Sequence, residues 1–193
     1  EEIDGATYKT LTPTVATYTV KFDPNGNGGS VSQANKTVTY GSTYGILPTP
    51  TRTGYEFVGW YTASSGGTQI TSTSKVTTSA NNQTLYAHWK AKTYTVTYNA
   101  NGGDVSQTSK TVTYGSTYGT LATPTKAGYK FAGWYTASSG GTQITSTTKV
   151  ITASNHTIYA HWTKIAIPTV KDVQWAQTDE GKFDYAWIEA EGK

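Results

Sequence analysis

The stretch GWYTASSGGTQITST occupies residues 59–73 and occurs again, without a single change, at residues 133–147. Aromatic residues that follow a glycine suit the end of a strand, and the Ser/Gly tract after them favours a turn. Segments that recur at a fixed spacing indicate a repeated structural unit. We therefore predict that a small β-rich module, present twice, decides the fold of this 193-residue chain.

The match extends outward from this stretch in both directions. It begins where YTVKF at residue 18 meets YTVTY at residue 94, and it ends where YAHW closes at Trp89 and Trp162. The copies differ in length only in Asn- and Gly-rich segments, which are typical of loop tips. We expect an N-terminal flank, two modules and a C-terminal β segment that begins a further module, with the boundaries 1–17, 18–91, 92–164 and 165–193.

Local patterns within one copy predict four strands and one short crossing segment. TYTVKF and KTVTYG alternate in polarity around an Asn/Gly turn, which predicts a hairpin, and GYEFVGWYT and QTLYAHW supply two more strands. The segment between the hairpin and the third strand has room for at most one helical turn. Ser42 suits its N-cap, and Pro48 and Pro50 prevent a longer helix.

The orientation of Trp60 stays open at the level of sequence. Glu56 in the first copy is Lys130 in the second, a reversal of charge that indicates a solvated position. Strict alternation from Glu56 would turn Trp60 outward as well. Gly59, however, is typical of a β-bulge, which would shift the alternation and turn Trp60 inward.

Composition points to a β-rich chain without a nucleic-acid partner. Hydrophobic residues make up 35% of the chain and charged residues 14%, and Thr, Ser, Gly, Asn and Tyr are abundant. The net charge is +3, but Arg52 is the only arginine of the sequence and the lysines are scattered rather than clustered, which argues against a groove that follows phosphates. No run of apolar residues is long enough for membrane insertion. The opening on Glu1, without a leader, suggests a piece of a longer protein.

The search for catalytic and metal sites gives no candidate. The second copy contains a single carboxylate, Asp104, so a paired-acid mechanism cannot be repeated in each module. His88, His156 and His161 have no second histidine or triad partner nearby in the sequence. DPNGNG resembles half of a calcium loop but has Ala34 where the loop needs glutamate. We expect no enzyme, no metal and no cofactor.

Aromatic side chains are the remaining candidates for a binding site. Flat rings on a rigid β surface can stack on sugar rings or bind a surface protein. The alternative is core packing, because a module of about 70 residues without disulfides needs its aromatic residues inside. Core packing is the favoured role of Trp89 and Trp162. The candidate ligand-binding residues are Trp60, Tyr61, Trp134 and Tyr135.

Two motif pairs carry a resemblance to a known family. GYEFVGWYT with LYAHW in the first copy, and GYKFAGWYT with IYAHW in the second, resemble the Listeria/Bacteroides repeat, also called the internalin B B-repeat. The resemblance covers residues 18–162. It implies an α+β, mostly β fold: two tandem, small β-grasp (ubiquitin-like) modules, here with β flanks. It also implies exported or surface-attached bacterial proteins without catalysis or cofactor.

Together these observations predict a non-enzymatic, extracellular repeat module of the bacterial cell surface or cell wall. Its expected role is a stalk or spacer, with a contribution to adhesion. The alternative is a module that binds a glycan or a host protein through surface aromatic residues. The expected partners are a host protein, a cell-envelope protein or a glycan, and the expected state is a monomer.

Overall fold

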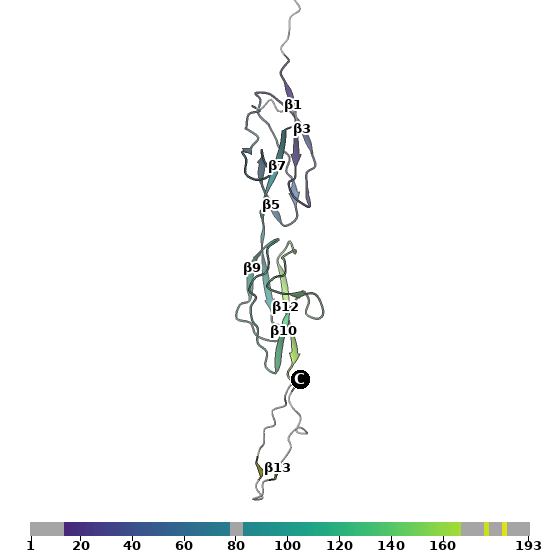
Figure 1. Ribbon diagram of the computed structural model, residues 1–193, viewed down its shortest axis with the longest axis vertical. Coiled ribbons are helices and arrows are strands. Elements are labelled where there is room, and N and C mark those ends of the chain that lie inside the picture. Colours follow the sequence, from purple (N-terminus) through teal and green to yellow (C-terminus); the bar gives the residue numbers. More distant parts are fainter. Residues whose placement is uncertain (1–13, 78–82, 167–175, 178–182, 185–193) are drawn as a thin grey trace, which may run out of the picture. The chain divides into compact units, whose positions relative to one another are not determined.

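The computed structural model describes residues 14–77, 83–166, 176–177 and 183–184, and in these residues every regular element is a strand (Figure 1). The first copy of the repeat contains seven strands and the second contains five. The strands of the first copy are β1 (Thr17–Asp23), β2 (Gly29–Ser30), β3 (Asn35–Thr39), β4 (Thr51–Arg52), β5 (Tyr55–Tyr61), β6 (Gln69–Ile70) and β7 (Gln83–Ala91). Those of the second are β8 (Thr93–Asn99), β9 (Ser109–Thr113), β10 (Tyr129–Tyr135), β11 (Gln143–Ile144) and β12 (His156–Lys164).

Each copy builds a five-stranded sheet with the same topology. The order is β3-β1-β7-β5-β6 in the first module, and its counterpart in the second is β9-β8-β12-β10-β11. β1 runs parallel to β7, in register from Val20 with Gln83 to Asp23 with Tyr86. Its other neighbour, β3, is antiparallel. The last long strand of the module in sequence, β7, therefore lies at the centre of the sheet.

The expectation of an α+β, β-grasp fold is wrong, because no helix occurs among the described residues and the architecture is all β. The segment around Ser42, where one helical turn was expected, has a turn at residues 40–41 and a bend at Ile46 but no helix. Gly41 and Gly45 have φ angles of 77° and 64°, which a right-handed helix cannot contain. Thr43 forms an isolated bridge with Lys75, so this segment is held by strand-like pairing.

A bulge in β5 decides where Trp60 points. Phe57 pairs with Trp89 and Gly59 pairs with His88, which leaves Val58 as an extra residue in β5. The shift turns Trp60 inward, where only 1% of its surface is exposed. Its indole Nε1 donates a hydrogen bond of 2.8 Å to the carbonyl oxygen of Pro48.

The same bulge occurs in the second module. The register of β10 shifts between Phe131 and Gly133, and Trp134 is 2% exposed. Gly133 has a φ of 140°, a conformation that side chains with a Cβ rarely adopt. The indole Nε1 of Trp134 donates a hydrogen bond of 2.8 Å to the carbonyl oxygen of Ala122, so the change from Pro48 to Ala122 between the copies leaves this bond intact.

A compact aromatic and aliphatic core lies under the sheet of the first module. The rings of Phe22 and Trp60 are 4.8 Å apart, and those of Phe57 and Trp60 are 5.5 Å apart. Tilted and edge-on pairs of this kind stabilise a core beyond the area they bury. The buried residues of this cluster are Val20, Phe22, Val38, Tyr44, Trp60, Val76, Leu85 and Ala87.

The buried core of the second module differs from that of the first at two positions, where Ile158 replaces Leu85 and a tyrosine replaces a phenylalanine. Tyr98 occupies the place of Phe22, and its ring lies 4.8 Å from that of Trp134. Burial raises the pKa of Tyr98, and the backbone of Ala122 lowers it in part. No described residue forms a hydrogen bond of good geometry with the hydroxyl. A buried hydroxyl without a partner costs free energy of folding.

We therefore expect Tyr98→Phe to leave the free energy of unfolding unchanged or to raise it by about 1 kcal/mol. The first module already contains this solution at Phe22. The matched control is Tyr118→Phe, which loses the 2.6 Å hydrogen bond to Nε2 of His156 and should lower the same quantity by about 1 kcal/mol. Urea unfolding followed by circular dichroism measures both. A loss at Tyr98→Phe as large as that of the control would mean that the hydroxyl has a partner.

The C-terminal segment contributes one short pairing. β13 (Ala176–Gln177) pairs antiparallel with β14 (Phe183–Asp184). The rest of the predicted strand-turn-strand, including Tyr185 and Trp187, lies outside the described residues. Residues 1–13 of the N-terminal flank also lie outside them.

Candidate functional site

The structure removes the two tryptophans of the predicted binding site from the surface. Trp60 and Trp134 are buried, so their rings cannot stack on a ligand in this conformation. The orientation that the sequence left open is thus inward for both tryptophans, and the bulge is the physical reason. Tyr61 and Tyr135 remain half-buried, and ligand binding by these two residues stays a prediction.

The histidines of the YAHW motif pack against these tyrosines. Tyr61 and His88 stack with ring centres 3.9 Å apart, and His88 Nε2 lies 3.0 Å from the carbonyl oxygen of Ala63. Tyr135 and His161 stack at the same distance. No group of three or more metal-ligating side chains occurs in the described part of the chain.

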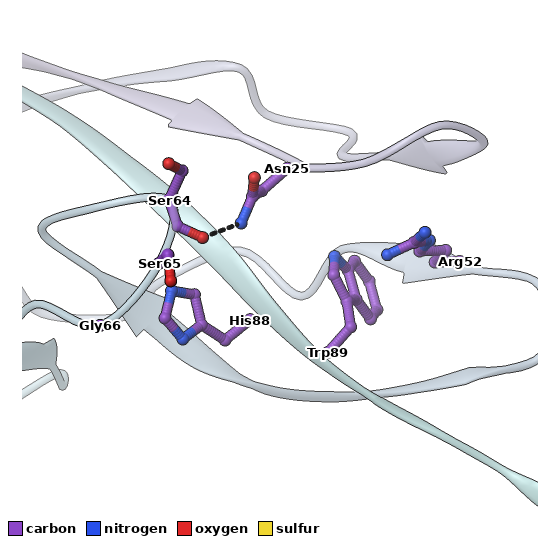
Figure 2. Close-up of a pocket in the computed structure, with 7 residues that line it drawn as sticks. All are labelled: Asn25, Arg52, Ser64, Ser65, Gly66, His88 and Trp89. Carbon is purple, nitrogen blue, oxygen red and sulfur yellow. Dashed lines mark hydrogen bonds between the residues drawn. The ribbon is translucent and has the colours of Figure 1, made fainter.

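An open pocket next to this stack brings together residues from four separate segments (Figure 2). Its volume is about 310 Å³. Asn25 enters from the turn after β1, Arg52 from β4, and His88 and Trp89 from β7, while the loop between β5 and β6 forms the remaining wall. The lining residues are Asn25, Arg52, Ser64, Ser65, Gly66, His88 and Trp89.

Asn25 holds the pocket walls together. Its side-chain Nδ2 donates to the carbonyl oxygen of Ser64 at 2.8 Å and to that of Ala87 at 2.9 Å. Its own φ is 48°, in the left-handed region that asparagine tolerates better than most residues. Its backbone N–H donates to Oδ1 of Asp23 at 2.8 Å. One side chain thus joins the hairpin turn, the β5–β6 loop and the central strand.

Arg52 supplies the positive charge of the pocket. Its guanidinium carbon lies 4.0 Å from the ring centre of Tyr55, a cation–π contact. A Cβ atom at Gly26 would lie 2.7 Å from a guanidinium nitrogen, so glycine there leaves space for the cation. Among the described residues no carboxylate forms an ion pair with Arg52.

Trp89 has one side in the core and one in the pocket. Its ring lies 5.6 Å from that of Phe57, and its Nε1 donates to the carbonyl oxygen of Pro24 at 2.7 Å. Trp89 therefore packs against the core, as predicted from the sequence, but it is only half-buried. The half-buried indole also forms a pocket wall, between Arg52 and His88 in Figure 2.

The second module contains the corresponding pocket, with a volume of about 400 Å³. Asn101, with a φ of 50°, donates to the carbonyl oxygens of Ser138 and Ala160 at 2.9 and 3.0 Å. Lys126 replaces Arg52, and its Nζ lies 4.7 Å from the ring centre of Tyr129. The lining residues are Asn101, Lys126, Tyr129, Ser138, Ser139, Gly140, His161 and Trp162.

The two copies have the same sheet topology, and each has a pocket at the corresponding place. These features define a tandem all-β repeat protein. Residues 18–88 and 94–161 each match the Listeria-Bacteroides repeat domain. The chain belongs to this family, which confirms the resemblance seen in the sequence.

Two bacterial relatives contain a similar segment as part of a longer protein. Internalin H of Listeria monocytogenes is 39% identical over 163 residues, which cover 83% of this chain and 28% of that protein. A "Putative membrane protein" of Evansella cellulosilytica is 36% identical over 148 residues, which cover 75% of this chain and 21% of that protein. The chain thus spans less than a third of either relative. No helix in its described residues has the length and apolar character needed to cross a membrane.

Proposed function

We propose that the two modules act as a non-enzymatic spacer of a bacterial surface or secreted protein, and that the chain is a monomer. The observation that supports this most directly is the duplication of an entire module, down to the same sheet order and the same buried tryptophan. Repetition of a folded unit adds length without adding a new activity. Membership of a repeat family found in internalin-like proteins supports the same role.

The connection between the modules favours this role as well. β7 ends at Ala91 and β8 begins at Thr93, so Lys92 alone separates the two sheets in the chain. A connection this short restricts the rotation of one module against the next more than a flexible Gly/Ser linker would.

Solution scattering tests the proposal on the chain itself. A single compact globule of 193 residues would have a radius of gyration of about 16 Å. We expect a monomer with a radius of gyration of about 18 Å or more, because a spacer keeps two modules of about 11 Å each apart instead of merging them into one globule. A value near that of the compact globule, or a dimeric mass, would contradict the spacer.

A further inference from the structure

The repeated pocket goes beyond a spacer, because a spacer needs no cation held open to solvent. We propose that each pocket binds an acidic saccharide: the carboxylate of a uronic-acid-type ring pairs with Arg52 or Lys126, and the ring lies on the exposed side of Trp89 or Trp162. This site is independent of the spacer role, and either proposal can fail alone.

The first argument is that the cation of each pocket has no carboxylate partner. In the described residues neither Arg52 nor Lys126 is in an ion pair, and each lies instead over a tyrosine ring, at 4.0 and 4.7 Å. Lys126 Nζ is also 5.9 Å from the ring centre of Trp162. Lys126 Nζ donates one hydrogen bond, of 3.2 Å, to the carbonyl oxygen of Asn101, which leaves two of its three donors. The remaining donors of the ammonium and those of the guanidinium can bind a carboxylate by charge-assisted hydrogen bonds.

The second argument is that the two pockets have a positive charge at the same position although the residue that carries it differs. The cation changes from Arg52 to Lys126, yet its charge and its place beside a glycine of the hairpin turn stay the same. On the neighbouring strand the exposed Glu56 becomes Lys130, so charge is not kept at every surface position. The two pockets therefore present the same combination of groups.

The third argument is the mixture of groups, which suits a sugar better than a peptide side chain. Ser64 and Ser65 are exposed, and their hydroxyls have no hydrogen-bond partner among the described residues. A pyranose ring offers hydroxyls to such groups and a flat C–H face to an indole, while its carboxylate reaches the cation. A volume of about 310 Å³ accommodates one ring, with the rest of the chain left in solvent.

The proposal is tested by titrating the full chain with trigalacturonate. The NMR signals of backbone and indole N–H groups monitor the titration. We expect saturable shifts at Trp89 and Trp162, with a dissociation constant on the order of millimolar at each site. The double variant Arg52→Gln with Lys126→Gln should weaken binding about tenfold or more. Arg52→Lys, which copies the second module, should keep binding within about threefold.

The matched control is Lys75→Gln with Lys149→Gln. These two lysines occupy equivalent exposed positions, one in each module, and lie outside both pockets. This variant removes the same total charge and should change affinity less than about twofold, since long-range attraction is screened by salt. Equal weakening by both double variants would show nonspecific attraction and overturn the proposal.

Two further ligands separate the acidic group from the ring. Neutral trigalactose should bind at least about tenfold more weakly, because it offers nothing to the cation. Inorganic phosphate should also bind more weakly, because it cannot use the indole face. Phosphate binding as tight as that of trigalacturonate would overturn the saccharide assignment, as would binding that both substitutions at Arg52 and Lys126 leave unchanged.

Discussion

Replacing Trp60 with alanine should lower the free energy of unfolding by about 3 to 5 kcal/mol. The indole is 1% exposed, contacts the rings of Phe22 and Phe57, and donates a hydrogen bond to Pro48. Alanine removes all of these contacts and leaves a cavity that a rigid sheet cannot fill. Guanidinium unfolding followed by circular dichroism measures the loss, as a shift of the midpoint.

The control for this prediction is the neighbouring residue on the bulge. Val58 is 47% exposed, so Val58→Ala should change the free energy of unfolding by less than about 0.5 kcal/mol. A cost at Trp60 below about 1 kcal/mol would mean that the side chain is not in the core. Surface binding through this residue would then return as a hypothesis.

The second large effect is expected at Asn25. Asn25→Ala should lower the free energy of unfolding by roughly 2 to 4 kcal/mol, because it removes two hydrogen bonds and places alanine at a φ of 48°. Asn25→Gly separates the two causes, since glycine adopts this φ freely but has no side-chain donor. We expect glycine to recover about 1 kcal/mol of the loss.

Asn25→Ala also tests whether the pocket is built by this side chain. The lost bonds join the hairpin turn to the carbonyl oxygens of Ser64 and Ala87, so the β5–β6 loop should become more mobile. Hydrogen exchange at the amide of Thr68, which bonds to Thr62 Oγ1 in that loop, reports on this motion. Unchanged exchange there, together with full stability, would show that Asn25 is dispensable.

The sequence predicts the number of modules and most long strands, because alternation and Gly/Asn turns are local signals. It does not predict the absence of a helix. The β-grasp expectation came from a resemblance, whereas Gly41 and Gly45, with positive φ, keep the crossing segment out of a helix. The side of the strand on which Trp60 lies depends on a bulge that Gly59 permits, and alternation by itself points the other way.

The pocket could not be read from the sequence because its residues come from four segments that only folding brings together. Trp89 and His88 stood out as parts of a motif but were interpreted as core and as isolated polar residues. A signal was available in the comparison of the copies. The pair Arg52 and Lys126 keeps its charge, and Asn25 and Asn101 keep their identity inside turns of different length.

The place of β7 at the centre of its sheet has a consequence for the order of folding. β7 is the last strand of the first module to leave the ribosome, yet it pairs with both β1 and β5. Until residue 91 has been synthesised, the hairpin of β1 and β3 and the hairpin of β5 and β6 have no strand between them. Pairing across this distance in the chain is slow and depends on the whole segment. Each module is therefore expected to fold all at once on completion, so that a chain cut short before β7 yields no folded part.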